Sequence, residues 1–407
     1  MKIAFFTDCY LDLTGGITTV INAEKTELEK RGHTVYLFSS AYPRSKSERE
    51  ALAQKHIFPV PSHRFFLRGL TPIAKNPTRL LKYFAKNFPE LADFDVFYVH
   101  YEASCSIAGL LLAQKYKIPS VQVMHGREDV GETNIIPFGF RTLVADFLNF
   151  AHSRYLPHET KIPRDDYLAH SRATAKMWEL MVNHANAADF LITPSKHFAK
   201  KLEKYGVKKR PLVLPNGISD ELFAEKPAPK TLAKNETLKI IWHSRISAEK
   251  RMMPFLEALT KVRGKYELDI YGGGGDFYRA KRFAKKHRLN ARFHGNAPFS
   301  KVYAAVKNSH LDILVSSNFD TFGMTIIEAA SAGVPTLIVD PDLAEIIPVG
   351  GGILARSPSP DDMAAAINDL LAHPEKLEQM SKILLAHRDE ARISRRIKDL
   401  TNFLSET

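Results

Sequence analysis

The sequence LDILVSSNFDTFGMTIIEAASAGVPTLIVD (311–340) contains the pattern that decides the fold. It begins with a short apolar run at 311–317, continues through a polar loop to a helical stretch from about Gly323, and ends in a second apolar run at 334–340. Two short buried strands separated by a helix are typical of a parallel sheet, because parallel strands need a crossover connection. The stretch therefore predicts a β-α-β unit whose polar loop follows its first strand.

The same alternation extends outward in both directions along the 407-residue chain. In the second half of the chain, further apolar runs occur at 238–244, 266–272 and 291–295. In the first half, they occur at 2–8, 33–40, 95–101, 120–125, 190–195 and 211–217. Amphipathic stretches separate most of these runs, as expected for parallel sheets that are covered by helices on both faces.

The length of the chain favours two domains, since a single core rarely grows to 400 residues. The polar stretch 224–239 has the composition of a linker. We therefore expect an α/β fold with a Rossmann-like domain at 1–218, a second one at 219–385, and a C-terminal helix at 386–407 that packs back on the first domain. Ligands bind outside the carboxyl ends of such strands, so the two parallel sheets are expected to face a central cleft.

Composition narrows the class of protein. Hydrophobic residues make up 44% of the chain and charged residues 25%, and no apolar run approaches the length of a membrane span. With only two cysteines, no disulfide framework is expected, and the default location is the cytoplasm. The net charge of +12 favours anionic partners such as nucleotide phosphates or an acidic lipid surface. Nucleic acid is disfavoured as a partner, because the sequence has no DNA- or RNA-binding motif.

Two carboxylates separated by seven residues mark the predicted loop and helix. Asp320 lies in the loop, and Glu328 lies in the second helical turn on the same face as Met324 and Thr325. Free amides at the helix start near Gly323 can contact an anionic or hydroxyl-rich ligand. Taken singly, Glu328 could be a solvated helix residue and Asp320 a turn former. The whole string with this spacing favours a binding site.

The string WHSRISAEKR (242–251) places two cations directly after a predicted strand. Arg245 offers a planar fork and Lys250 a compact charge, and together they can neutralise a pyrophosphate whose charge grows as a bond to it breaks. The alternative is a pair of surface cations that flank a helix cap at Ser247. The position at the end of a strand favours the phosphate-binding interpretation.

Three further strand ends carry candidate residues. TGG (14–16) follows the first strand, and Gly15 and Gly16 allow the backbone to approach a ligand at a helix N-terminus. His125 ends a strand in MHGRED (124–129), and Gly273 lies in GGGGD (272–276). The alternatives are a tight turn at 14–16, a purely structural role for His125 and a flexible turn at 272–276.

These strings together resemble the retaining family 4 glycosyltransferases of the GT-B fold. FFTDCYLDLTGGITTVI (5–21) and SRISAEK (244–250) are most similar to bacterial diacylglycerol glucosyltransferases. The resemblance implies that Glu328 binds the ribose of a nucleotide-sugar and that Asp320 and His125 contact the transferred sugar. It also implies that the glycine loop at 14–16 lies where the donor phosphate and the acceptor meet, and that the loop at 272–276 lies near the base. The family most often has glutamate at the position of Asp320, so the donor sugar is expected to sit differently or to be another epimer.

The resemblance makes His125, Asp320, Arg245 and Lys250 the candidate catalytic residues. The candidate nucleotide-sugar-binding residues are Gly15, Gly16, Arg245, Lys250, Gly273, Gly323, Met324, Thr325 and Glu328. No separate cofactor and no metal is expected, because Arg245, Lys250 and helix dipoles take over the role of a cation. The acidic triplets at 93–95 and 340–342 look like the metal motif of the other glycosyltransferase fold but predict turns.

The implied activity is the transfer of a hexose, with glucose from UDP-glucose as first choice, to an acceptor hydroxyl such as that of diacylglycerol. Retention of configuration is expected through a front-face displacement. Alternatives are a protein or polysaccharide acceptor with UDP-GlcNAc or GDP-mannose as donor, a nucleotide-sugar epimerase, and a non-catalytic sugar-nucleotide-binding protein.

The segment 63–88 suggests how a lipid acceptor is reached. Leu80, Phe84 and Phe88 form one helical stripe, and basic residues form another. This face could rest on the anionic inner surface of the plasma membrane, which would make the protein peripheral. Alternatively, the apolar stripe is buried against the sheet of the first domain. Both interpretations remain open from the sequence.

Overall fold

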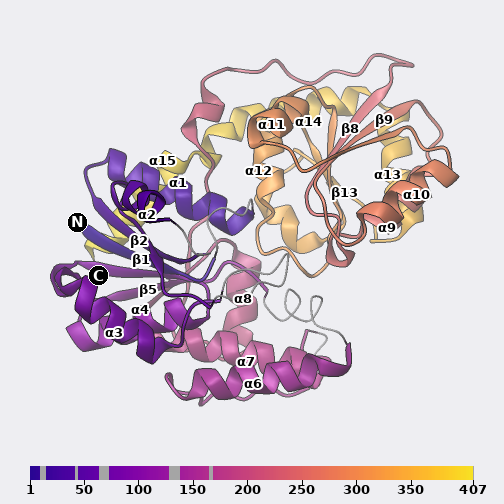
Figure 1. Ribbon diagram of the computed structural model, residues 1–407. Helices are drawn as coiled ribbons and strands as arrows, with labels where there is room; N and C mark the ends of the chain where they lie inside the picture. Colours follow the sequence, from indigo (N-terminus) through magenta and orange to yellow (C-terminus); the bar gives the residue numbers. More distant parts are fainter. Residues whose placement is uncertain (10–14, 42–44, 64–72, 128–137, 165–167, 407) are drawn as a thin grey trace. The chain divides into compact units, whose positions relative to one another are not determined.

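The computed structural model describes residues 1–9, 15–41, 45–63, 73–127, 138–164 and 168–406. The chain forms two compact units, one made of Met1–Pro215 and Arg396–Thr407 and the other of Asn216–Arg395. Each unit is a parallel sheet covered by helices, as Figure 1 shows. The predicted α/β fold with two Rossmann-like halves is confirmed.

Unit 1 contains a seven-stranded sheet in the order β3-β2-β1-β4-β5-β6-β7, and every neighbouring pair is parallel. Its strands are β1 (Lys2–Thr7), β2 (Thr34–Ser40), β3 (Ile57–Val60), β4 (Val96–His100), β5 (Ser120–Val123), β6 (Phe190–Thr193) and β7 (Leu212–Val213). Its helices are α1 (Gly16–Lys30), α2 (Lys46–Ala53), α3 (Pro77–Asn87), α4 (Ser104–Tyr116), α6 (Arg141–Ser153), α7 (Arg172–Ala187), α8 (Lys196–Lys204) and α15 (Ile393–Ser405), most of which lies in unit 1. The central strands are apolar along their length because helices bury both faces of the sheet.

Unit 2 contains a six-stranded parallel sheet in the order β10-β9-β8-β11-β12-β13. Its strands are β8 (Leu238–His243), β9 (Tyr266–Tyr271), β10 (Ala291–Gly295), β11 (Leu311–Leu314), β12 (Thr336–Ile338) and β13 (Ile353–Leu354). Its helices are α9 (Met252–Leu259), α10 (Phe277–Lys286), α11 (Phe299–Lys307), α12 (Met324–Ser331), α13 (Pro360–Ala372) and α14 (Glu375–His387). The β-α-β unit predicted at 311–340 corresponds to β11, α12 and β12.

The apolar stripe of the segment 63–88 belongs to the core of unit 1. Leu80, Phe84 and Phe88 are buried. The rings of Phe84 and Phe88 pack edge-on against Phe38, with centroids 5.0 and 4.9 Å away. The interpretation in which this stripe rests on a membrane is therefore wrong, because the rings are needed to cover the sheet. The basic side of α3 is exposed, and residues 64–72 lie outside the described part of the chain.

The polar stretch at 224–239 is not the connection between the units. The chain passes from one unit to the other after Pro215 and after Arg395, and 224–239 lies within unit 2. There the backbone N–H of Lys230 donates to Ser381, and Leu232 is buried in the core. The linker predicted from polar composition is therefore wrong, because a few buried contacts hold this stretch in unit 2.

The C-terminal helix α15 is held in unit 1 by a buried ion pair. The guanidinium Nε of Arg396 lies 2.6 Å from Glu24 of α1, and both side chains are almost completely buried. Nη1 of the same guanidinium also donates to the carbonyls of Leu214 and Pro215. A guanidinium that donates to several acceptors at once fixes the first turn of α15 against α1 and the segment that follows β7.

Candidate functional site

The predicted site residues of unit 2 gather at one edge of its sheet. Strands β9, β8, β11 and β12 are neighbours and parallel, so their carboxyl ends all meet at this edge. The loops that follow them carry the sequence strings singled out above at 244–251, 272–276 and 315–323. Ligands bind at this position in open α/β sheets, because several loops and helix N-termini converge there.

Lys250 and Asp320 form a direct ion pair at this edge. The ammonium Nζ lies 2.7 and 2.8 Å from the two carboxylate oxygens of Asp320, and both side chains are largely buried. Ser316 donates its hydroxyl to the same carboxylate, and the ring of Phe319 lies 5.3 Å below the ammonium. The two residues come from different loops, so the pair joins the β8 loop to the β11 loop.

Arg245 is the exposed cation of the same loop. Its side chain is 66% exposed, and its contact with Glu249 is 3.4 Å long. The guanidinium is therefore held only loosely by the protein. This loop therefore carries two positive charges. The exposed guanidinium of Arg245 can move, and the buried ammonium of Lys250 is fixed.

A histidine that the sequence argument did not single out lies between two carboxylates. His243, the last residue of β8, has Nε2 3.1 Å from Asp312 of β11 and Nδ1 3.4 Å from Glu328 of α12. Thr336 of β12 donates its hydroxyl to the other oxygen of Asp312. Burial alone would lower the pKa of His243, but the two carboxylates raise it to about 10. His243 is therefore a cation at neutral pH and fixes the carboxylate of Glu328.

The charge of His243 predicts a loss of stability in alkali. The pKa is raised from 6.5 to about 10 by folding, so the stabilisation is complete below pH 6.5 and decreases as pH rises toward 10. The free energy of unfolding of unit 2 should fall by at most about 1.4 kcal/mol per pH unit in this range. Urea unfolding of the wild type and of His243→Gln at several pH values tests this. The variant should lose this slope, and an equal slope in both proteins contradicts the assignment.

The helix α12 begins at this edge without a side-chain cap. Gly323 is its N-cap with a φ of 73°, and an added Cβ would lie 2.7 Å from Leu314, so glycine is required there. The amides of Met324 and Thr325 in the first turn have no acceptor within the helix. The hydroxyl of Thr325 is buried and has no hydrogen-bond partner among the described residues. Donors of this kind suit an anionic ligand.

The glycine loop after β9 packs against the loop after β8. Gly272 and Gly274 have φ values of 123° and 146°, and a Cβ on them would lie 2.3 and 2.4 Å from the carbonyls of Ser244 and Ile246. The carbonyl of Gly273 accepts from the amide of Ile246 at 2.8 Å. The loop therefore holds the segment that bears Arg245 close to the sheet edge. Gly273 itself acts here through its backbone.

Asp340 orders the loop that bears Asp320. Its carboxylate accepts the backbone N–H of Asn318 at 2.6 Å and that of Asp342 at 3.1 Å. The acidic triplet at 340–342 thus makes turn hydrogen bonds. Within the described ranges, no group of three or more His, Cys, Asp or Glu side chains could hold a metal ion.

The predicted residues of unit 1 lie at the carboxyl edge of that unit's own sheet. Gly15 is the N-cap of α1 and makes no side-chain cap, and the positive end of the α1 dipole lies at this edge. Its φ of −165° is ordinary extended backbone, so this position does not require glycine. Gly16 is the first residue of α1, and Thr14 of the same string lies outside the described part of the chain.

His125 lies just beyond β5, next to the end of β4. Its Nε2 is 2.8 Å from Nδ1 of His100, and the two rings stack at 5.1 Å. Burial, with a smaller effect from the positive charge of Arg396, lowers the pKa of His125 to about 3. The imidazole is therefore neutral at physiological pH and acts through hydrogen bonds. A neutral imidazole can position a ligand through hydrogen bonds but supplies no positive charge.

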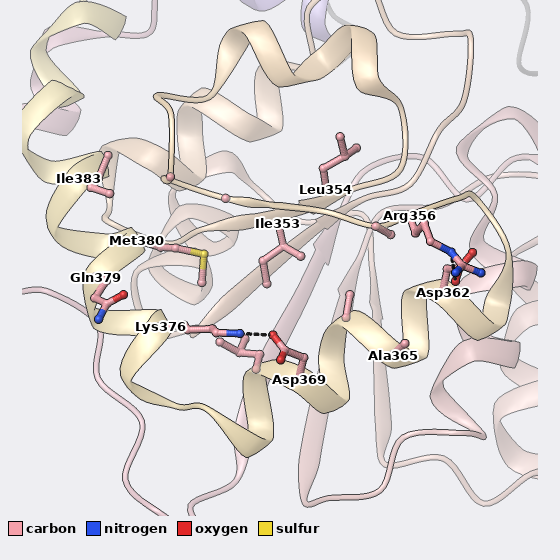
Figure 2. A pocket seen from close by; sticks show the side chains of 15 residues that line it. Ile353, Leu354, Arg356, Asp362, Ala365, Asp369, Lys376, Gln379, Met380 and Ile383 are labelled. Atoms are coloured by element: carbon pink, nitrogen blue, oxygen red, sulfur yellow. Dashed lines mark hydrogen bonds and ion pairs between the residues drawn. The ribbon is translucent and has the colours of Figure 1, made fainter.

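A pocket on another side of unit 2 contains none of the predicted residues. Figure 2 shows it between the edge strand β13 and the helices α13 and α14, with an apolar floor that includes Ile353 and Met380. Its charged side chains are paired with one another, as in the 2.6 Å contact between Lys376 and Asp369. The candidate site therefore remains the carboxyl edge of the sheet.

Among the helices of the described residues, none combines the length and the apolar character needed to cross a bilayer.

Two Rossmann-like units with parallel sheets are the architecture of GT-B glycosyltransferases. Residues 14–222 match Glycosyltransferase Family 4, and residues 224–384 match Glycosyl transferases group 1. The first match covers more than half of the chain, and the protein belongs to glycosyltransferase family 4. The family and the GT-B fold expected from the sequence are confirmed.

Among curated relatives, the alpha-monoglucosyldiacylglycerol synthase of Streptococcus pneumoniae is 24% identical over 355 residues, which span 83% of this chain and 70% of that protein. The synthase of the same name from Acholeplasma laidlawii is 25% identical over 358 residues, which span 83% and 80%. Among solved structures, HepE of Anabaena in complex with UDP has a TM-score of 0.70 and 16% identity over the full length of both chains. The pneumococcal O-GlcNAc transferase GtfA in complex with UDP and GlcNAc has a TM-score of 0.69 and 12% identity, over 100% of this chain and 99% of that one.

Proposed function

We propose that the protein transfers glucose from UDP-glucose to the hydroxyl of a membrane lipid such as diacylglycerol, with retention of anomeric configuration. One observation carries the donor assignment: Arg245, Lys250 and the first turn of α12 converge on the sheet edge beside the fixed carboxylate of Glu328. The lipid acceptor is supported by the two relatives that are alpha-monoglucosyldiacylglycerol synthases, and the donor by the HepE structure that contains UDP-glucose.

Each residue has a defined role in the proposed complex. Lys250, Arg245 and the amides of α12 hold the diphosphate, and the carboxylate of Glu328 accepts hydrogen bonds from the ribose hydroxyls. Asp320 receives hydroxyls of the glucosyl group and is oriented by Lys250. The amides at the start of α1 and the neutral His125 face the acceptor side of the reacting sugar. No cofactor is needed, since the cations neutralise the leaving group.

The proposed reaction is a displacement on one face of the sugar. The bond between the anomeric carbon and the diphosphate oxygen breaks, and the acceptor oxygen bonds to the same carbon from the same side. The acceptor proton passes to the departing phosphate oxygen. Negative charge grows on the diphosphate as the bond lengthens, so the fixed ammonium of Lys250 stabilises the transition state more than the ground state.

Donor and acceptor are tested together in one assay. The protein is incubated with UDP-glucose, UDP-GlcNAc or GDP-mannose, with and without vesicles that contain diacylglycerol, and released nucleotide and glycolipid are measured. UDP release that depends on diacylglycerol, with an α-linked product, supports the proposal. Release without an acceptor indicates hydrolysis, and interconversion of the sugar indicates an epimerase. Binding without turnover of any donor indicates a non-catalytic protein, and a β-linked product overturns retention.

Replacing Glu328 with glutamine should weaken UDP binding about 10- to 100-fold, because a hydrogen bond to a charged acceptor is worth about 1.5–3 kcal/mol. Isothermal titration calorimetry with UDP measures the change. Glu257→Gln is the matched control, since Glu257 is an exposed carboxylate of α9 in the same unit. Unchanged affinity in Glu328→Gln would remove Glu328 from the proposed ribose site.

A further inference from the structure

Helix α6 carries apolar side chains on two opposite faces. On its inner face, Ala145 and Leu148 pack against Ala173 and Met177 of α7, which itself is largely buried. Figure 1 shows the two helices side by side in unit 1. On its other face, four large apolar side chains follow one another at intervals of three, four and three residues, which places them on a single line along the helix. This outer stripe consists of Phe140, which is the N-cap of α6, and of Leu143, Phe147 and Phe150 within the helix.

The outer stripe is exposed to an unusual degree. Its four side chains are 60–67% exposed. Within the described part of the chain, the remaining large apolar side chains that are exposed are spread over other elements: Ile73, Tyr278, Phe299, Val349 and Leu354. Single exposed apolar residues need no explanation, whereas a continuous line of them marks an interaction surface. The stripe does not stabilise unit 1, since the inner face of α6 already makes the contacts with α7.

A cation lies at one end of the stripe. Arg154 lies on the same helical line, with its guanidinium 5.8 Å from the ring of Phe150. The two acidic residues between 138 and 164 are both paired with cations from elsewhere in unit 1. Asp146 lies 2.8 Å from Arg172, and Glu159 lies 2.5 Å from Lys208. Lys161 of the same segment is also paired, since its ammonium lies 3.7 Å from Glu179. A partner of the stripe therefore meets apolar rings with the exposed guanidinium of Arg154 at one end.

We propose that the outer stripe docks unit 1 on an anionic lipid bilayer, with α6 lying along the surface. In this position the three rings and Leu143 enter the boundary between headgroups and acyl chains, and Arg154 reaches lipid phosphates. A line of apolar side chains with a cation at one end suits such a surface. A second copy of the chain fits less well, because two chains that each carry a net charge of +12 repel one another. A stripe of four side chains is also small beside the roughly 800 Å² per partner of a stable interface.

The inference extends the proposed function and rests on it for its purpose. A lipid acceptor resides in the membrane, so an enzyme that uses it gains from being held at the surface. The docking surface differs from the one expected from the sequence, since the rings of α3 are buried and those of α6 are exposed. Binding to vesicles can be measured without any donor, so the two proposals can fail independently.

The test is sedimentation of the protein with phosphatidylcholine vesicles that contain phosphatidylglycerol. The double variant Phe147→Ser and Phe150→Ser should lower the partition coefficient at least about tenfold, because each ring that leaves water contributes on the order of a tenfold change. Arg154→Gln should weaken binding to these vesicles and reduce its dependence on salt, with little effect on pure phosphatidylcholine. The matched control is Tyr278→Ser, which removes a single exposed ring from the basic helix α10 and should leave binding unchanged.

Three results would overturn the docking proposal. The first is equal vesicle binding by the wild type and the double variant, with native folding of both confirmed by circular dichroism and UDP affinity. The second is equal loss of binding in the Tyr278→Ser control. The third is a wild-type dimer in lipid-free buffer that the double variant dissociates, which would make the stripe a contact between two copies. Stripe-dependent vesicle binding without transfer to diacylglycerol would leave the docking intact and overturn only the acceptor assignment.

Discussion

Replacing Lys250 with methionine should lower the turnover of the nucleotide-sugar roughly 10²- to 10³-fold, the usual effect of removing one fixed donor from a developing oxyanion. The ammonium is held by both oxygens of Asp320 and by the ring of Phe319, so it is already oriented before the donor binds. Methionine fills similar space over the ring but carries no charge. The expected loss is therefore in the chemical step rather than in folding, and it is measured as the rate of UDP release at saturating donor.

Two comparisons separate this role from simple pairing with Asp320. If Lys250 served only to neutralise Asp320, the double variant Lys250→Met and Asp320→Asn would be no slower than Asp320→Asn alone. We expect the double variant to be much slower, because the diphosphate still lacks its cation. Lys261→Met is the control, since Lys261 is an exposed lysine at the end of α9. Near-normal UDP release by Lys250→Met contradicts the assignment.

The fold could be predicted from the sequence because its signal is local. Strands buried on both faces must be almost wholly apolar, and the turns between them need glycine, proline or polar residues. The strings after the strands also identified the edge where Lys250, Asp320 and Glu328 meet. That their loops gather at one edge followed from one rule, that parallel strands end at the same edge of the sheet. The direct pairing of Lys250 with Asp320, in contrast, depends on how two loops fold over that edge.

The residues that the sequence argument missed act through contacts between distant segments. His243 is separated from Asp312 and Glu328 by a long stretch of chain, and the three meet only when β8 and β11 are neighbours. One signal was available: an aspartate inside the apolar run LDILV (311–315) must have a partner if it is buried. The buried and exposed stripes of α3 and α6 show the same limit. Helical spacing reveals a stripe, but only packing decides whether it faces the core.

Unit 1 contains a row of buried histidines whose protonation state follows from one amide. The side-chain nitrogen of Gln122 donates to two backbone carbonyls, so its oxygen must accept from Nε2 of His184 at 3.1 Å. Nδ1 of His184 then accepts from Nε2 of His152 at 3.0 Å, and Nδ1 of His152 accepts from His158 at 3.0 Å. When the three histidines are neutral, each of these ring nitrogens donates or accepts one hydrogen bond. A proton added to His184 would place two donors against each other.

This arrangement should make unit 1 unstable in mild acid. Burial lowers the pKa of His125 and His184 to about 3 and, with the neighbouring histidines, that of His152 to about 2. The unfolded chain takes up these protons near pH 6.5 and the native state does not. The stabilisation is therefore complete above pH 6.5 and decreases as pH falls toward 3. Three such groups together lower the free energy of unfolding by up to about 4 kcal/mol per pH unit, so unit 1 should unfold near pH 5.

The two tryptophans of the chain allow each unit to be followed separately, since buried Trp178 lies in unit 1 and buried Trp242 in unit 2. In the Trp242→Phe variant, the fluorescence of Trp178 should report unfolding between pH 6 and roughly pH 5. In the Trp178→Phe variant, Trp242 should change little over this range, because the proton on His243 is already bound in native unit 2. Adding His184→Gln to the Trp242→Phe variant should remove about a third of the decrease in the free energy of unfolding of unit 1 per pH unit. A Trp178 signal that stays constant down to pH 4 would mean that the native state accommodates these protons, and the neutral row of histidines could not be its ground state.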